Sequence, residues 1–489
     1  MKRRNFLQSG LLAGATTAVP RSLRGNSRPA RELKNATADA VVFIWLPGGV
    51  AQTDTWDPKQ HTPYQEGMKG NELLGTCDSI PTAVDGLRLG KGLETIASVM
   101  DQGAILRSLT NDVTFGAIHL KAQHYMMTGN LFPVGVKAPS LGAVVGRTLG
   151  RRNPAVPEYI YIGRDIDTSD NEKLFTSEFL GPGFYGINYG PFMIPDPTQG
   201  LSTLESAAGM ATARLDRRQK LFKNIADLSE REIKESAKAG EYLKTIDDAR
   251  AMMDSPVKAA FNYHTEETPE IIAAYEPQIE GARLLDPSYD NGRRFGHGLL
   301  LARRLLERGA RFIQVEYQYG PFKGFDMHEN GSQRMIEMKQ QIDAPIGNFI
   351  KDLRDRGLLE RTLVVIASEF GRTIASQPKA GSEADGAAES HTGESLVLDR
   401  ESMYGFHGHF SSSTSMVFFG GGIRKGHVHG KTADRHPMKT VENPVPLIDA
   451  HATIYHALGI PADTFYTVED RPFFVTKDGK GTPVKELLS

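Results

Sequence analysis

Six short runs of β-branched and aromatic residues constrain the fold of this chain most strongly. They are AVVFIWL, GAILRSL, PEYIYIG, ARFIQVEY, TLVVIAS and TSMVFFG, spread over residues 40–420. Several of them are apolar throughout, without alternating polar residues, which is typical of strands covered on both faces of a parallel sheet. Such a sheet needs helices on both sides.

Two helical patterns lead directly into two of these runs. GHGLLLARRLLERGA precedes ARFIQVEY, and MIEMKQQIDAPIGNFIKDLRDRGLLE precedes TLVVIAS. In the first pattern the leucines fall on one face, Arg304 and Arg308 fall on the other, and Gly309 marks the helix C-terminus. Repeated helix-to-strand units predict an α/β fold with a central, mostly parallel sheet and right-handed crossovers.

The remaining segments suggest how the chain is divided. We expect a single α/β domain over residues 37–489, with a helical insertion at about 201–262, which is rich in Ala, Leu, Lys, Glu and Arg. Residues 374–402 are polar and rich in small side chains, so we expect a surface loop there that helps to select a substrate.

The N-terminus has the composition of a targeting segment. MKRRNFLQSGLLAGATTAVP combines a basic start with a short, mildly apolar middle, and a polar linker follows it to residue 36. RRNFLQ, with the pair Arg3 and Arg4, resembles a twin-arginine export signal. We therefore expect the twin-arginine export machinery as a partner and the periplasm, the cell envelope or the extracellular space as the location. The alternative is an ordinary basic N-terminus.

Composition excludes several classes of partner and site. The chain has 57 basic and 59 acidic residues, and this balance argues against a nucleic-acid partner. No apolar run reaches the about 18 residues of a transmembrane helix. Cys77 is the only cysteine, so the chain has neither an internal disulfide nor a cysteine cluster for zinc or iron–sulfur. Any metal must be held by His, Asp and Glu.

Side chains that can hold a cation gather at the ends of the predicted strands, where open α/β sheets bind their ligands. They are Asp54, Asp57, Asp326, His328, Glu369, His407 and His409. Carboxylates with imidazoles suit Zn, Mn or Fe, or Mg or Ca where oxygen dominates. Two alternatives stay open: an Asp after a strand often caps a helix or forms a turn, and paired histidines arise by chance in a chain with 14 of them.

Eight blocks of the sequence resemble a known family. They are PGGVAQTDTWDPK, RSLTNDVTFGAIHLKAQHYMMTG, PSLGAVVGRTLG, FGHGLLLARRLLERGARFIQVEY, GFDMHENG, GLLERTLVVIASEFGRT, MVFFGGGIRKGHVHGKT and IDAHATIYHALGI. In this order they resemble the landmarks of the bacterial family catalogued as domain of unknown function 1501, from about residue 38 to the C-terminus. The resemblance implies an alkaline-phosphatase-like sandwich, because that family is placed in the superfamily of metal-dependent alkaline phosphatases and sulfatases.

The resemblance also implies a metal site for one or two divalent ions, Zn, Mn, Mg or Ca. Its expected ligands are Asp54, Asp326, His328, Glu369 and His409. Glu369 stands where the superfamily has an Asp, and two positions next to expected ligands also depart from the pattern. Phe370 stands where the superfamily has a His or Asn, so a second metal would lose a ligand, and Gly408 stands where the family usually has Asp.

The resemblance makes His119 and Arg372 the expected catalytic residues. His119 lies ten positions before Gly129, where the superfamily has its nucleophile, and a histidine can form a phosphoryl intermediate or act as general acid or base. Arg372 is expected to hold the substrate anion by two hydrogen bonds, with a structural ion pair as the alternative. Ala51 stands where relatives tend to have Ser.

Two hypotheses follow for the function. The first is an exported, metal-dependent hydrolase of phosphate or sulfate esters, acting on a small-molecule or glycan ester. The alternative is a non-catalytic exported binding or cell-surface protein that retains the fold, which Ala51, Phe370 and Gly408 favour.

Overall fold

The computed structural model describes residues 36–489 apart from 111–117, 132–135, 164–179, 205–236 (of which 217, 220, 221 and 224 are described), 279–290, 319–323, 329, 375, 378–390, 393–395 and 469. The predicted twin-arginine segment lies outside the described residues, as do much of the predicted helical insertion and the middle of the predicted polar loop.

The centre of the protein is a mixed β-sheet, nine-stranded within the described residues. Its order is β16 (His427–His429), β5 (Gly103–Thr110), β15 (Thr414–Phe419), β9 (Thr362–Ala367), β1 (Ala40–Trp45), β8 (Phe312–Glu316), β6 (Tyr159–Ile162) and β7 (Phe192–Ile194), with β19 (Val445–Pro446) also paired to β5. Neighbours run parallel except at β15, which is antiparallel to β5 and to β9. The predicted mostly parallel sheet is confirmed, and all six apolar runs contribute strands to it.

Three adjacent strands end at one level. Trp45, the last residue of β1, lies opposite Glu316 of β8 and opposite Ala367 of β9. The segments that leave these strands therefore start side by side at one edge of the sheet, and two of them lead to Asp54 and Asp326.

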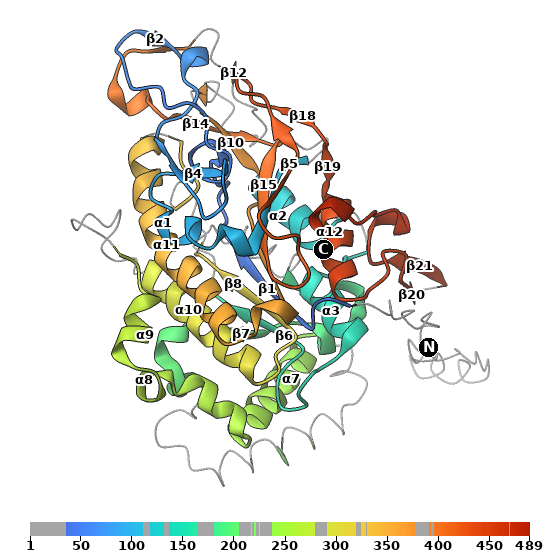
Figure 1. The fold of residues 1–489 in the computed structure, drawn as a ribbon. Helices are drawn as coiled ribbons and strands as arrows, with labels where there is room; N and C mark the ends of the chain where they lie inside the picture. The colour runs from blue at the N-terminus through green and yellow to red at the C-terminus, as the bar shows by residue number, and fades with distance from the viewer. Residues whose placement is uncertain are drawn as a thin grey trace, which may run out of the picture.

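Helices cover both faces of this sheet, as the residues of β1 show. Val42 and Ile44 belong to the apolar core that includes residues of α10 and α11, whereas Val41 and Phe43 belong to the core on the other face. Figure 1 shows this sandwich, whose helices are α10 (Asn291–Glu307) and α11 (Gly331–Asp355) on one face and α2 (His119–Thr128), α3 (Leu141–Leu149) and α12 (Leu447–Ala457) on the other.

Helix α10 confirms the predicted helix but corrects its polar face. The helix is followed by Gly309 at φ 89°, as expected for a helix C-terminus. Arg304, expected on a solvent-facing side, is 4% exposed and pairs with Glu266 and Glu267. The prediction was wrong because α8 (Tyr263–Glu266) and the residue after it lie over this side of α10 and supply the carboxylates.

The two predicted special segments are described only in part. Within the predicted insertion, α7 (Ala237–Met253) and η7 (Pro256–Phe261) are helical. Where we expected only a loop, three short strands occur, and this corrects the prediction: β11 (Ser376–Gln377), β12 (His391–Thr392) and β13 (Val397–Leu398). Among the described residues, no helix combines the length and apolar character needed to cross a membrane.

Candidate metal centre

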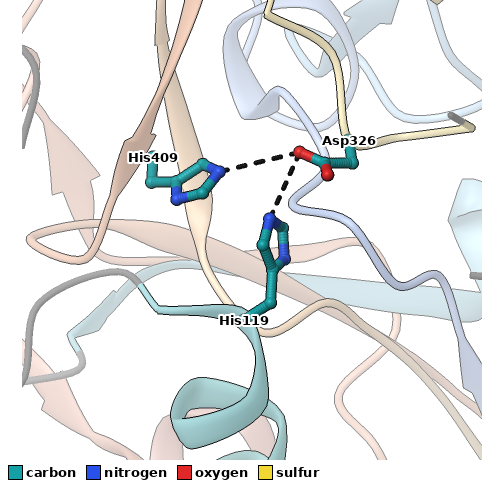
Figure 2. Close-up of side chains that lie close together, drawn as sticks. All are labelled: His119, Asp326 and His409. Atoms are coloured by element: carbon teal, nitrogen blue, oxygen red, sulfur yellow. Dashed lines mark ion pairs between the residues drawn. The ribbon is translucent and has the colours of Figure 1, made fainter. Parts of the chain in front are cut away.

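Three side chains from separate parts of the chain meet beyond the carboxyl ends of the central strands. His119 is the first residue of α2, Asp326 follows β8, and His409 lies in β14 (His407–Phe410). One ligand atom from each lies within 4.8 Å of the other two, and within the described residues they form the one group of three or more such side chains. Figure 2 shows the two imidazoles pointing at the Asp326 carboxylate.

The spacing of these atoms fits a shared metal ion. The Nε2 atoms of His119 and His409 lie 3.2 Å and 3.6 Å from Asp326 Oδ1. Two ligands about 2.1 Å from one ion are about 3.4 Å apart at a tetrahedral angle. Two imidazole nitrogens and one carboxylate oxygen are donors that Zn and similar transition metals accept.

The Pro-Gly-Gly break after β1 allows the loops around this group to pack closely. Gly48 has φ 111°, and a Cβ atom there would lie 2.5 Å from the backbone nitrogen of Asp326. A Cβ atom on Gly49, at φ 84°, would lie 2.5 Å from the ring of Phe370. The loop after β1 thus lies directly against the segments that follow β8 and β9.

Glu369 lies behind His119 rather than in the group of three. It is fully buried, and its Oε1 atom is 2.8 Å from His119 Nδ1. The same oxygen accepts hydrogen bonds from the Gly48 N–H at 2.8 Å and from Gln123 Nε2 at 3.2 Å. With the Nδ1 proton donated to Glu369, the Nε2 atom of His119 faces Asp326, as in metal sites where an outer carboxylate orients a histidine ligand.

His328 lies beside the group of three. Its Nε2 atom is 3.2 Å from Asp326 Oδ1, and its ring centroid is 5.0 Å from that of His409. The structure therefore brings together Asp326, His328 and His409, which were predicted to be metal ligands, and adds His119, which was expected to be a catalytic residue.

Asp54 is separate from these residues, contrary to its expected place among the metal ligands. It is fully buried, and its two carboxylate oxygens accept hydrogen bonds from the backbone N–H and the hydroxyl of Thr76, at 3.0 Å and 2.6 Å. Its Oδ2 atom is also 3.7 Å from Nε2 of His407. The order of residues along the chain could not show that Asp54 contacts Thr76 and His407, which are distant in sequence, and not the group of three.

Arg372 is fully buried and uses all five of its guanidinium N–H groups within the protein. Their acceptors are the backbone oxygens of Gly49 (3.1 Å), Met327 (3.0 Å), His407 (3.2 Å) and Gly48, and Asp326 Oδ1 (2.7 Å). This geometry favours the structural alternative over the anion clamp, because no donor is left for a substrate.

Charges around the group shift the pKa values of its members. Burial favours neutral His119, but the Asp326 and Glu369 carboxylates outweigh it and raise the pKa of His119 to about 9. Burial, together with the charges of His119 and Arg372, holds the pKa of His409 well below its usual value. Against the effect of burial, His119 and the other imidazoles hold the pKa of Asp326 well below its usual range. Because a metal ion must displace the Nε2 proton of His119, metal binding at this site competes with protonation of His119.

Three further residues complete the site. Phe370 is fully buried, with its ring centroid 4.9 Å from that of His119 and 4.7 Å from that of His409, and so forms an apolar wall. His407 is fully buried, which lowers its pKa to about 4, against the effect of Asp54. Gln123 was not predicted, although its place four residues after His119 on a helix puts both on one face.

Comparison with known proteins identifies a family. The family model described as "Protein of unknown function (DUF1501)" matches residues 38–488. A search of curated proteins finds no match.

Solved structures give remote similarities. The lipoteichoic acid synthase LtaP from Listeria monocytogenes has 11% identity and a TM-score of 0.37, with 91% of this chain and 76% of that chain covered. The PsFucS1 sulfatase from Pseudoalteromonas sp. has 12% identity and a TM-score of 0.36, with 94% and 77% covered. The phosphonate monoester hydrolase SpPMH from Silicibacter pomeroyi has 12% identity and a TM-score of 0.34, with 92% and 76% covered. Similarity at this level carries no argument about function.

Proposed function

The chain belongs to the DUF1501 family, and from this premise we propose that it is an exported, metal-dependent hydrolase of phosphate or sulfate esters. The observation that carries the proposal is the convergence of His119, Asp326 and His409, whose ligand atoms lie within 4.8 Å of one another. Their position beyond the carboxyl ends of the strands is where open α/β sheets bind substrates.

The proposed chemistry divides between the ion and the protein. When bound, a divalent ion would polarise an ester oxygen and lower the pKa of water in the site. Glu369 holds the Nδ1 proton of His119, and Phe370 excludes water from one side of the group. His119 serves in this proposal as a ligand and not as the nucleophile, because each of its ring nitrogens faces a carboxylate.

Export and substrate class are further parts of the proposal. The pair Arg3 and Arg4 supports passage through the twin-arginine machinery to the periplasm or the cell envelope. A fusion of residues 1–36 to a reporter protein should be exported, and replacing both arginines by lysine should stop export. The substrate class, a small-molecule or glycan ester, rests on the resemblance of the sequence blocks to their family.

Turnover by purified protein tests the hydrolase. Residues 37–489, loaded in turn with Zn, Mn, Mg and Ca, should cleave at least one ester in a panel of aryl phosphates and sulfates. Asp326→Asn should lose both bound metal and at least about 100-fold in rate, since it removes a charged ligand. Asp478→Asn changes an exposed carboxylate and should behave as wild type.

The competing class is a non-catalytic binding protein, and one observation favours it. Ala51 is fully buried and offers no nucleophile at the position where relatives tend to have Ser. Folded protein that binds metal through Asp326 but cleaves no ester in the panel would support this class and overturn the hydrolase.

A further inference from the structure

Resting on the proposed metal site, we infer that it takes a single metal ion and that the buried guanidinium of Arg372 supplies the second positive charge beside Asp326. Arg372 Nη2 donates a hydrogen bond of 2.7 Å to Asp326 Oδ1, the oxygen that also faces the Nε2 atoms of His119 and His409. The Arg372 guanidinium and the proposed metal ion thus both contact the Asp326 carboxylate.

The guanidinium cannot readily make room for a second ion. Its other four N–H groups are donated to backbone oxygens of three segments: the loop after β1, the segment after β8, and β14. Moving it would leave these carbonyl oxygens without their donors, and a buried acceptor that loses its donor is costly. An arginine also keeps its charge at any ordinary pH.

Asp54, which was also expected to hold metal, is connected to this arginine through His407. Arg372 Nη1 contacts the backbone oxygen of His407, and the His407 ring in turn faces Asp54, with Nε2 3.7 Å from Oδ2. Both oxygens of Asp54 already accept hydrogen bonds from Thr76. The ammonium of buried Lys339 adds a second fixed charge, 3.3 Å from the backbone oxygen of Asp54.

Electrostatics disfavours a second ion here. A divalent ion near Asp54 would be close to the charges of Arg372 and Lys339, and repulsion between buried charges is weakly screened. One ion at the group of three and the buried Arg372 guanidinium beside it supply positive charge to the site, and the guanidinium of Arg334 near Asp326 adds to it.

Metal stoichiometry tests this inference without an activity assay. Protein comprising residues 37–489 would be saturated with Mn²⁺ and then freed of excess ion. Its metal content would be measured, and its electron paramagnetic resonance spectrum recorded. We expect one ion per chain, with the six-line spectrum of an isolated Mn²⁺. Asp54→Asn should keep one ion with its Kd changed by less than about threefold, whereas Asp326→Asn should lose the ion.

The outcomes separate this inference from the proposed function. Two ions per chain, an exchange-coupled spectrum, or loss of an ion in folded Asp54→Asn would overturn the inference and leave the hydrolase standing. No bound ion in wild type would overturn both. If Asp54→Asn does not fold, as judged by circular dichroism, the wild-type stoichiometry and spectrum decide.

Discussion

At the scale of single residues, Glu369 shows how a carboxylate can serve a metal site without being a ligand. It accepts hydrogen bonds at 2.8 Å from both His119 Nδ1 and the Gly48 N–H, so it ties the start of α2 to the loop after β1. Its charge favours the His119 tautomer whose Nε2 atom faces Asp326. Glu369 therefore controls the ligand set through His119.

Glu369→Gln keeps the size of this side chain and removes its charge. We expect about 10- to 100-fold weaker metal binding, with the ion still bound, because the outer partner of a ligating histidine is weakened. Competition with a chelator would measure the Kd. Glu360→Gln, at an exposed position, is the matched control, and equal affinities in the two variants would contradict the role of Glu369.

Glu316 links protein stability to pH. Burial raises its pKa to about 8, aided by the charge of Glu369 and opposed by a 2.6 Å hydrogen bond from the Tyr161 hydroxyl. The folded state thus holds the proton more tightly than the unfolded chain, whose glutamates titrate near 4.3. The stabilisation is complete below that unfolded value and is lost as pH rises towards 8.

Glu316→Gln should remove this pH dependence. Relative to wild type, the variant should gain free energy of unfolding between pH 5 and pH 8, by an amount on the order of a few kcal/mol. Thermal melts of both proteins at the two pH values would measure the gain. Glu442→Gln, at an exposed position, should follow wild type, and a constant difference between Glu316→Gln and wild type would contradict the raised pKa.

At the scale of elements, one helix caps another. Asp343 in α11 accepts hydrogen bonds of 2.9 Å from the backbone N–H groups of Thr95 and Ile96, in the first turn of α1 (Glu94–Ala97). The N-terminus of α1 has no side-chain cap from its own N-cap residue, so a distant carboxylate satisfies its N–H groups.

Asp343→Ala should lower the free energy of unfolding by about 1–3 kcal/mol, since one buried and one partly buried N–H group lose their acceptor. Urea unfolding monitored by circular dichroism would measure the change. Asp355→Ala, at an exposed site at the end of the same helix, should cost less than about 0.5 kcal/mol, and a similar loss in both variants would show that the capping is unimportant.

At the scale of the whole molecule, the candidate metal centre joins distant segments. His119 and Asp326 are more than 200 residues apart in the sequence. The three side chains of the centre come from a helix, a loop and a strand. An ion that binds only the folded chain stabilises it, by about 2.7 kcal/mol at about 100 times its Kd.

Removal of metal by a chelator should therefore lower the melting temperature, and added ion should restore it. Asp326→Asn should melt at a temperature that neither chelator nor ion changes, because the centre has lost its shared carboxylate. Differential scanning calorimetry would record these transitions. A wild-type melting temperature that is independent of metal would contradict the coupling of the centre to the fold.

Much of the fold follows from the sequence, and the reason lies in local patterns. Apolar runs without alternation predicted the strands, and 3.6-residue periodicity predicted α10 and α11, because both patterns reflect burial on regular elements. The direction of each strand was harder to predict from the sequence. Strand β15 is antiparallel to its neighbours, and its composition does not show this. Arg304 looked solvent-exposed because its carboxylate partners belong to another part of the chain.

The sequence by itself determined which chemistry is available: imidazoles and carboxylates at strand ends, and a single cysteine that excludes thiolate sites. Only the tertiary structure decided which of these groups meet. It placed His119 with Asp326 and His409, set Glu369 behind His119, and placed Asp54 against Thr76 and His407. The physical reason is a difference in precision. The end of a strand locates a side chain at one edge of the sheet, but only to within the length of a loop. Ligands of one ion must lie within a few ångströms of one another, and the packing of distant segments sets those distances.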